Sequence, residues 1–291
     1  MSNLFALIRR HRLNFLRDRV AVFFSLLSVF ITISLYILFL KKMQVDFLAD
    51  VASDSKQLTL LVDKWFVAGI LSIIPVTTTL AQFHIPIHDT ERKVTADFLT
   101  TPVPRAILQL SYMCNAIITG FIFSLIAFFL CELLIVVNGG TLLTFAETVR
   151  VLLILLLAVI LSSTMNALLT MFLKTQNAFS IISTLVGTFI GFLCGVYIPL
   201  GMLPTFVQYI IMYFPISHLT LLLRDVFMSD SLADIFANAP PEVLEEYTLM
   251  FGVVFKMHGQ FISPVVSYLF SIGSIGILLF FLIFLYTRKF R

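Results

Sequence analysis

"WFVAGILSIIPVTTTLAQF", residues 65–83, carries no charged side chain, and the polar stretch "HDTERKVTADFLTTPVPR", residues 88–105, follows it almost at once. Beyond the polar stretch the chain turns apolar again from Ala106. A helix needs about 20 apolar residues to cross the hydrocarbon core of a bilayer. The pattern therefore predicts two membrane-spanning helices joined by a charged segment.

The composition extends this interpretation to the whole chain. Hydrophobic residues make up 59% of the 291 and charged residues only 12%, with a mean hydropathy of +1.03. Soluble domains carry about a quarter charged residues, so a water-soluble core is excluded. The three cysteines lie in apolar runs without metal or disulfide spacing. We predict an all-α polytopic membrane protein with a single transmembrane domain over residues 1–291.

Six apolar runs have the length of a membrane span. They cover residues 20–40, 65–83, 106–137, 151–173, 178–200 and 262–286. A further apolar stretch is interrupted by Pro204 and Pro215, and a proline inside a helix removes a backbone hydrogen bond. We predict that residues 199–223 form a re-entrant helical hairpin on the outer side, before the last span.

The distribution of charge orients these spans. Arginines and lysines gather in "RRHRLNFLRDR" (9–19), in the 88–105 island, at Lys174 and in the tail "RKFR", all on one side of a six-span layout. Because basic loops face the cytoplasm, both termini are predicted to be cytoplasmic in a multi-pass protein of the cell membrane. The acidic segment 224–261 is predicted to be extracytoplasmic.

Residues 3–19 favour an amphipathic helix at the membrane surface. Its apolar face would hold Leu4, Phe5, Leu7, Ile8, Phe15 and Leu16, with Arg10 and Arg17 opposite and His11 and Arg12 interrupting the pattern. A basic retention tail is the alternative interpretation.

Motifs for catalysis are missing from the sequence. No glycine is followed by lysine, which excludes a phosphate-binding loop of the G-x-x-x-x-G-K-[ST] type. Pro86 lies between His84 and His88 and disfavours the helical turn that would align them on a metal. We predict no enzymatic activity, no metal or other cofactor bound by this chain, and no nucleic-acid partner.

Polar residues inside the spans are candidates for a substrate path. Such residues also hold helices together, and the sequence leaves both roles open. The candidates are Thr77, Thr78, Gln82, Ser183, Thr184 and Thr188, together with Glu132, the one acidic residue within the predicted spans. Gly187, Gly191 and Gly195 recur every four residues and predict close packing with another helix.

Two stretches resemble the membrane subunits of ABC exporters of the type-two permease class. "HDTERKVTADFLTTPVPRAILQLSY" is similar to that family's E-R element with its closing P-x-x-R, at Glu91, Arg92, Leu99, Pro102 and Arg105. "GVYIPLGMLPTFVQYIIMYFPISHLTLLLRD" is similar to the family's G-x-x-x-P, L-P and P-[IL]-x-[HY] elements with a closing arginine. These residues are Gly195, Pro199, Leu203, Pro204, Pro215, Ile216, His218 and Arg224.

The resemblance implies partners and roles. Two such permeases, identical or paralogous, would face each other in the bilayer, with two copies of a separate ATPase that binds ATP and Mg. Residues 84–105 would form a cytoplasmic coupling element that lies along the membrane surface and contacts the ATPase through Asp89, Glu91, Arg92, Lys93, Asp97, Leu99, Pro102 and Arg105. An outer gate would involve Pro199, Pro204, Pro215, His218 and Arg224.

The resemblance also implies a function. We expect the permease of a bacterial ATP-driven exporter that moves a drug, an antimicrobial peptide or a lipid-like amphiphile. A lipid-linked polysaccharide exporter and a non-pumping sensor or immunity subunit are the alternatives. An ion-coupled carrier is disfavoured, since carriers place several charges at mid-membrane depth.

Overall fold

The computed structural model describes residues 2–17, 55–100, 104–257 and 259–289, together with Ser34, Tyr36 and Lys41. The first predicted span, 20–40, therefore lies almost wholly outside the described residues. Within them the chain is helical apart from its turns and one short hairpin.

The helices follow one another along the chain, separated by short turns. They are α1 (Ser2–Arg17), α4 (Ser55–Gln82), α5 (His84–Glu91), α6 (Val94–Leu99), α7 (Arg105–Val137), α8 (Phe145–Thr170) and α9 (Gln176–Leu193). The second half holds the 3-10 turn η2 (Leu200–Met202), α10 (Thr205–Tyr213), α11 (Pro215–Ile235), α12 (Pro241–Met250) and α13 (Pro264–Lys289). Strands β1 (Lys256–Met257) and β2 (Gln260–Phe261) form an antiparallel pair just before α13.

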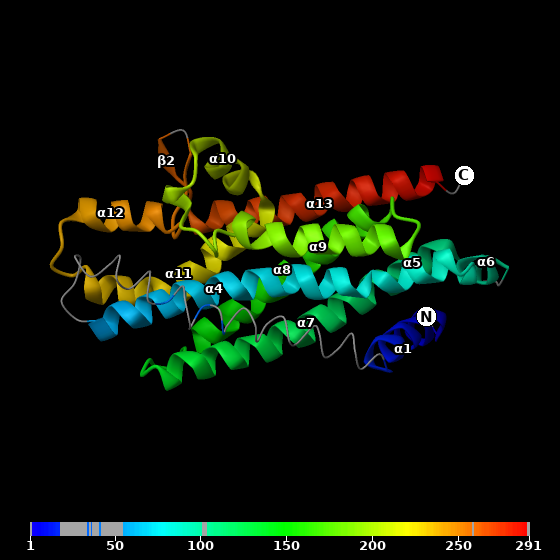
Figure 1. The fold of residues 1–291 in the computed structure, drawn as a ribbon, viewed down its shortest axis with the longest axis horizontal. Helices are drawn as coiled ribbons and strands as arrows, with labels where there is room; N and C mark the ends of the chain where they lie inside the picture. Colours follow the sequence, from blue (N-terminus) through cyan, green and yellow to red (C-terminus); the bar gives the residue numbers. More distant parts are fainter. Residues whose placement is uncertain are drawn as a thin grey trace.

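The long helices form an elongated bundle with two different ends (Figure 1). Helices α1, α5 and α6 lie at one end together with the end of α13, whereas α10, α12 and β2 lie toward the other. The charged island and both terminal helix ends thus share one end of the molecule.

Among the described residues, five helical stretches are long and apolar enough to cross a membrane. They are Lys56–Glu91, Arg105–Val137, Phe145–Thr170, Gln176–Leu193 and Pro264–Arg288. Helices α10 and α11 form a further apolar pair that bends by 86° at Phe214. The prediction of an all-α polytopic membrane protein is confirmed.

Several boundaries differ from those expected from hydropathy. Helix α4 begins at Ser55 rather than at residue 65, although this adds Asp63 and Lys64 to the helix. Asp63 is fully buried because its carboxylate accepts hydrogen bonds from Tyr36, Lys41 and Asn138 at 2.7–2.9 Å. The predicted span at 65–83 leaves Asp63 outside the helix, whereas its three hydrogen-bond donors hold it inside the bundle.

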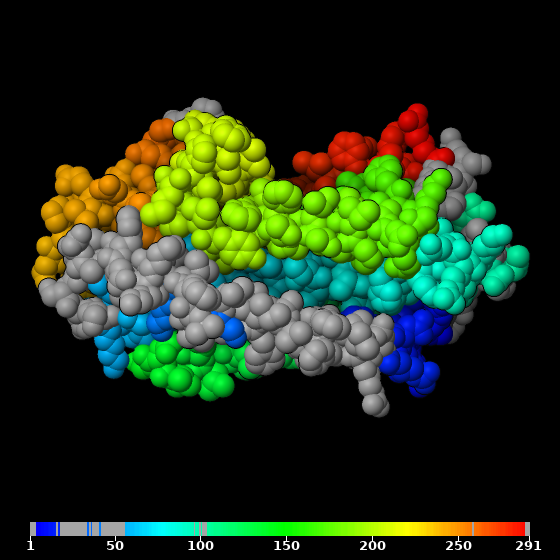
Figure 2. All heavy atoms as spheres, viewed as in Figure 1, coloured from blue at the N-terminus to red at the C-terminus, as the bar shows by residue number. Residues whose placement is uncertain are grey.

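Helix α4 is the centre of the bundle. It packs against α7, α8, α9 and α11, and most of its residues are buried. By contrast, only 17% of the α9 span and 11% of the α13 span are buried within this chain. Figure 2 shows α9 running uncovered along one face of the molecule.

Candidate functional site

The charged island folds into the two short helices α5 and α6. Lys93 separates them with a φ of 61°, a left-handed conformation that ends helical continuity. The sequence predicts an element lying along the membrane surface, whereas α5 in fact continues the line of α4 over Lys56–Glu91. Pro86 permits this, because it lies in the first turn of α5, where no intrahelical N–H is needed.

Asp89 fixes α5 to two other helices. The Arg10 guanidinium of α1 donates two hydrogen bonds to its carboxylate, at 2.8 and 3.0 Å, and the Tyr112 hydroxyl of α7 donates a third at 2.8 Å. Asp89 is only 2% exposed. Asp89 is predicted to contact the ATPase, whereas its carboxylate here faces the inside of the bundle and binds Arg10 and Tyr112.

Arg10 also reaches α6 and borders a buried histidine. Its guanidinium lies 5.1 Å from the centre of the Phe98 ring. His11 is fully buried, with Nε2 3.0 Å from the Ser111 hydroxyl and its ring 4.3 Å from that of Tyr112. Burial and the Arg10 charge lower the pKa of His11 to about 4, so its imidazole is neutral at physiological pH.

The first residue of α9 binds α5 on another side. The Glu91 carboxylate accepts the N–H of Gln176 at 3.2 Å, and the Gln176 side-chain amide donates to the His84 carbonyl at 2.9 Å. Helix α5 thus has polar contacts with α1, α7 and α9, which favours its movement together with the spans.

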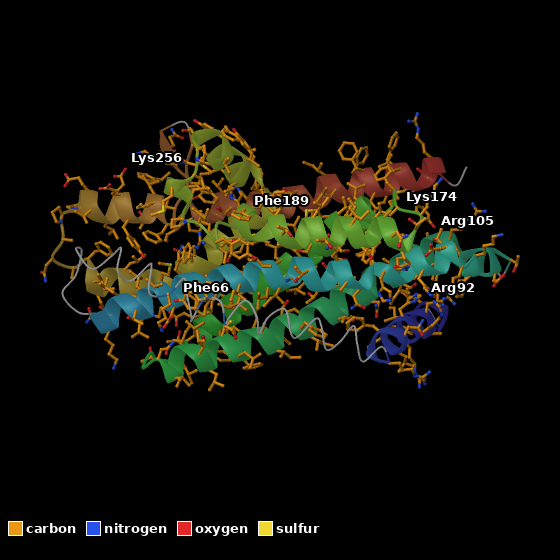
Figure 3. All side chains as sticks on the ribbon, in the orientation of Figure 1. Phe66, Arg92, Arg105, Lys174, Phe189 and Lys256 are labelled. Atoms are coloured by element: carbon orange, nitrogen blue, oxygen red, sulfur yellow. The ribbon has the colours of Figure 1, made fainter. Side chains whose placement is uncertain are left out.

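The remaining predicted coupling residues lie around the tip of this assembly. Arg92, Lys93 and Asp97 are exposed, and Arg105 begins α7 on the same end of the bundle. Figure 3 shows Arg92, Arg105 and Lys174 at this end. Leu99 is the last residue of α6, and Pro102 lies outside the described residues.

Sequence reasoning missed the residues that hold α5 in place, namely Arg10, His11, Ser111 and Tyr112. The i, i+4, i+8 spacing of Leu7, His11 and Phe15, all buried, was the available signal. Phe5, predicted for the apolar face of a helix at the membrane surface, is 68% exposed within this chain.

The predicted path residues of α4 are mostly internal. Thr77 is partly buried, and the hydroxyls of Thr77 and Thr78 donate to carbonyls of their own helix. Gln82 accepts a hydrogen bond from the Asn115 amide at 3.0 Å while being 3% exposed. The contacts of Thr78 and Gln82 match the helix-packing alternative, and this chain leaves neither open to a path.

The candidates on α9 differ, because that helix is largely uncovered. Thr184 and Thr188 are exposed, whereas Ser183 is partly buried. Gly187 has no other side chain or helix within 4 Å of where a Cβ would lie. This face is uncharged and combines hydroxyls with apolar groups such as Phe189, which is 56% exposed.

The predicted glycine stripe is wrong as a single helical feature. Gly195 lies beyond the end of α9 with a φ of 59°. At Gly191 an added Cβ would overlap the Tyr197 ring, so the close neighbour of Gly191 is the following turn rather than another helix.

Glu132 lies near the end of α7 and is 7% exposed. Its carboxylate accepts the N–H of Leu143 at 3.2 Å. No described basic residue forms an ion pair with it. The contact with the loop before α8 suggests that Glu132 holds this turn in place.

Prolines shape the opposite end of the molecule. Pro199 and Pro204 precede η2 and α10, and Pro215 is the first residue of α11. The sharp bend places His218 next to the last turn of α10, with Nε2 2.9 Å from the Met212 carbonyl and Nδ1 3.1 Å from the Ser267 hydroxyl of α13. Helix α11 continues to Ile235, well past the predicted hairpin end at 223.

Arg224 joins two chain turns at this end. Its guanidinium donates to the carbonyls of Gly195 at 2.7 Å, Phe251 at 3.0 Å and Gly252 at 3.1 Å. It also lies 4.7 Å from the centre of the Trp65 ring. Arg224 is 2% exposed, and none of the described carboxylates forms an ion pair with it. Backbone dipoles therefore stabilise this buried charge.

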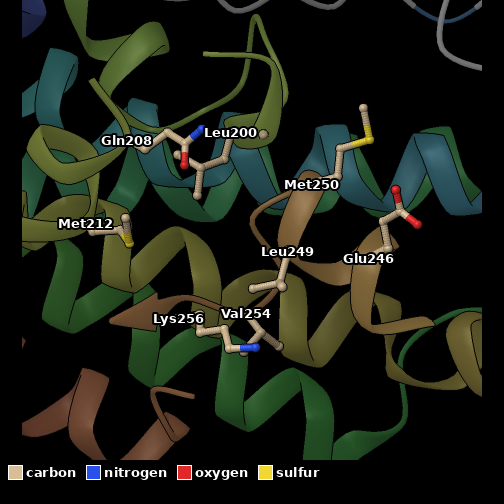
Figure 4. Close-up of a pocket in the computed structure, with 9 residues that line it drawn as sticks. Leu200, Gln208, Met212, Glu246, Leu249, Met250, Val254 and Lys256 are labelled. Atoms are coloured by element: carbon tan, nitrogen blue, oxygen red, sulfur yellow. The ribbon is translucent and has the colours of Figure 1, made fainter. Parts of the chain in front are cut away.

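A cavity of about 430 Å³ opens nearby, between η2, α10, α12 and β1 (Figure 4). Gln208, Glu246 and Lys256 are its polar lining residues. Lys256 also bonds to Glu245 at 2.8 Å, which ties β1 to α12.

The described part of the chain contains no group of three or more His, Cys, Asp or Glu residues placed to hold a metal ion. At both ends of the bundle, polar contacts hold the helices together. Exposed charged side chains lie at the α5–α6 end.

The family model described as "ABC-2 type transporter" matches residues 2–228, from α1 into α11. No curated protein matched the chain.

Proposed function

The chain belongs to the ABC-2 type transporter family and is a membrane-embedded permease subunit that acts with an ABC ATPase; from this premise we propose that it is an exporter permease whose α5–α6 end receives the motion of that ATPase. No feature of the described residues separately favours the two alternatives, a lipid-linked polysaccharide exporter and a non-pumping sensor or immunity subunit.

The observation that carries this proposal is the contrast between the base and the tip of the α5–α6 assembly. At the base, Asp89 is held by Arg10 and Tyr112. At the tip, Arg92 and Asp97 are exposed. An assembly fixed to the spans at one side and charged at the other can convert contact with a partner into helix movement.

The proposed contact uses the exposed charges rather than Asp89. Opposite charges at an interface set orientation and partner choice, and they act strongly on the association rate. We expect the groove of the ATPase to carry charges complementary to Arg92 and Asp97. The ATPase itself would bind ATP and Mg, and two ATPase copies would serve a pair of permeases.

The uncovered face of α9 supports a second permease. Gly187 leaves room for close helix approach, and Thr184 and Thr188 bring hydroxyls to the same face. A path between two such faces would be uncharged and part polar. It therefore suits an amphipathic cargo such as a drug, a peptide or a lipid-like compound, moved out of the cytoplasm or inner leaflet.

Co-purification with the candidate ATPase tests this proposal. We expect Arg92→Ala combined with Asp97→Ala to reduce complex formation or ATPase stimulation, because both side chains are exposed and neither forms an ion pair with a described residue. A matched control is Asp230→Ala with Asp234→Ala, two exposed charges at the end of α11. Equal binding and stimulation by both double variants would contradict the assignment of the tip.

A further inference from the structure

A second cavity of about 430 Å³ lies at the α5–α6 end, between α5, α7, the end of α8 and α13. Its size falls within the roughly 300–1,000 Å³ typical of small-molecule sites. Neither the coupling contact nor the proposed cargo path uses it.

The cavity has an apolar inner wall. Phe83, Ile87, Leu108 and Ala167 line it, and each is at most 5% exposed. They come from the start of α5, from α7 and from α8, so the wall belongs to the packed part of the bundle. A small polar ion alone would leave this surface without a partner.

The mouth of the cavity is polar and basic. Thr90 and Lys174 are exposed lining residues, and Gln109 is partly buried beside them. The Lys174 ammonium forms no ion pair with a described residue. None of the lining residues is acidic. Arg105 lies at the same end as Lys174 in Figure 3, which adds to the positive potential.

We propose that this cavity binds an acidic phospholipid from the leaflet at the α5–α6 end, with its phosphate at Lys174 and its glycerol and upper acyl region against the inner wall. A zwitterionic lipid would bring its own quaternary ammonium close to Lys174 and cancel part of the attraction. Free phosphate would leave the apolar wall unfilled. An acidic phospholipid pairs its charge with Lys174 at the mouth and places its apolar part against the inner wall.

Occupancy would bear on coupling, because Thr90 belongs to α5 and Thr95 to α6. This consequence rests on the proposed function. The binding itself does not, and it is therefore measured on the full-length permease without an ATPase.

The test is lipid titration of the purified protein in neutral detergent, followed by native mass spectrometry, with phosphatidylglycerol, phosphatidylcholine and inorganic phosphate as separate probes. We expect preferential binding of phosphatidylglycerol, weakened about tenfold by Lys174→Gln through loss of one charge-assisted hydrogen bond. Gln109→Trp, which fills the mouth, should weaken it as well.

Arg288→Gln is the matched control, since Arg288 is an exposed base on α13 at the same end and does not line the cavity. Equal affinity for the two phospholipids would overturn the proposal. So would equal effects of Lys174→Gln and Arg288→Gln. Displacement of phosphatidylglycerol by inorganic phosphate at similar concentration would indicate a free-anion site and would also overturn it.

Discussion

Removing Arg10 should weaken the attachment of α1 to α5 far more than removing its neighbour Arg9. The Asp89 side chain is 3% exposed and that of Arg10 is 32% exposed. Loss of one partner from a fully buried ion pair costs about 3–5 kcal/mol, because the remaining charge stays desolvated. Water can partly replace Arg10, so we expect Arg10→Ala to cost about 2 kcal/mol, below that range.

Arg9→Ala is the matched control, because Arg9 is exposed on the same helix, and surface changes of this kind cost less than about 0.5 kcal/mol. Thermal unfolding can be followed with a thiol-reactive dye, since Cys131 and Cys194 are each 1% exposed in the folded protein. We expect a midpoint lowered by about 4–8 °C for Arg10→Ala only. The combination Arg10→Met with Asp89→Leu should recover most of the loss. Equal midpoints for Arg10→Ala and Arg9→Ala would refute the reasoning.

Four further predictions concern His11, Arg224, Gly191 and Gly187. The pKa of His11 is about 4 when folded against an ordinary 6.5. As pH falls, His11 therefore binds a proton in the unfolded chain at a higher pH than in the folded chain. The free energy of unfolding is highest above pH 6.5 and decreases toward pH 4. Between pH 6.5 and 5, His11→Gln should lose about 2 kcal/mol less stability than the unchanged protein, as measured by circular dichroism melts. Arg224→Lys should cost about 3 kcal/mol in the same melts, because one ammonium cannot reach all three carbonyls; an unchanged midpoint would show that these bonds are dispensable. Gly191→Ala should cost about 1–3 kcal/mol and be restored by adding Tyr197→Ala, since the new Cβ overlaps that ring. A Cβ added at Gly187 has no neighbour within 4 Å, so Gly187→Ala should stabilise the isolated subunit by about 1 kcal/mol. If a second copy packs on this face, the same change should weaken subunit association in sedimentation.

Much of the bundle could be predicted because a bilayer imposes simple lengths on apolar runs. The runs at 106–137 and 262–286 coincide closely with α7 and α13. Boundaries were less predictable where a specific contact overrides hydropathy. Asp63 extends α4 because its donors come from distant segments, and Gly195 ends α9 early in a turn held by Arg224.

The candidate site was predictable in place but not in orientation. The charge of the 88–105 stretch marks it as a surface element. Which of its acids turn inward depends on the docking of α1, whose Arg10 is 79 residues away from Asp89. Likewise, hydroxyls on α4 and α9 look alike in the sequence, and only packing separates the internal Thr78 from the exposed Thr184.

Site-specific photo-crosslinking tests the central claim most directly. A benzoylphenylalanine at Arg92, in the membrane-embedded complex, should crosslink to the ATPase, and the same group at Glu242, exposed on α12 at the opposite end, should not. Crosslinks from position 92 alone are the result that our account predicts. No ATPase adduct at position 92, or equal adducts at both positions, would contradict the account in which α5 and α6 receive the motion of the ATPase.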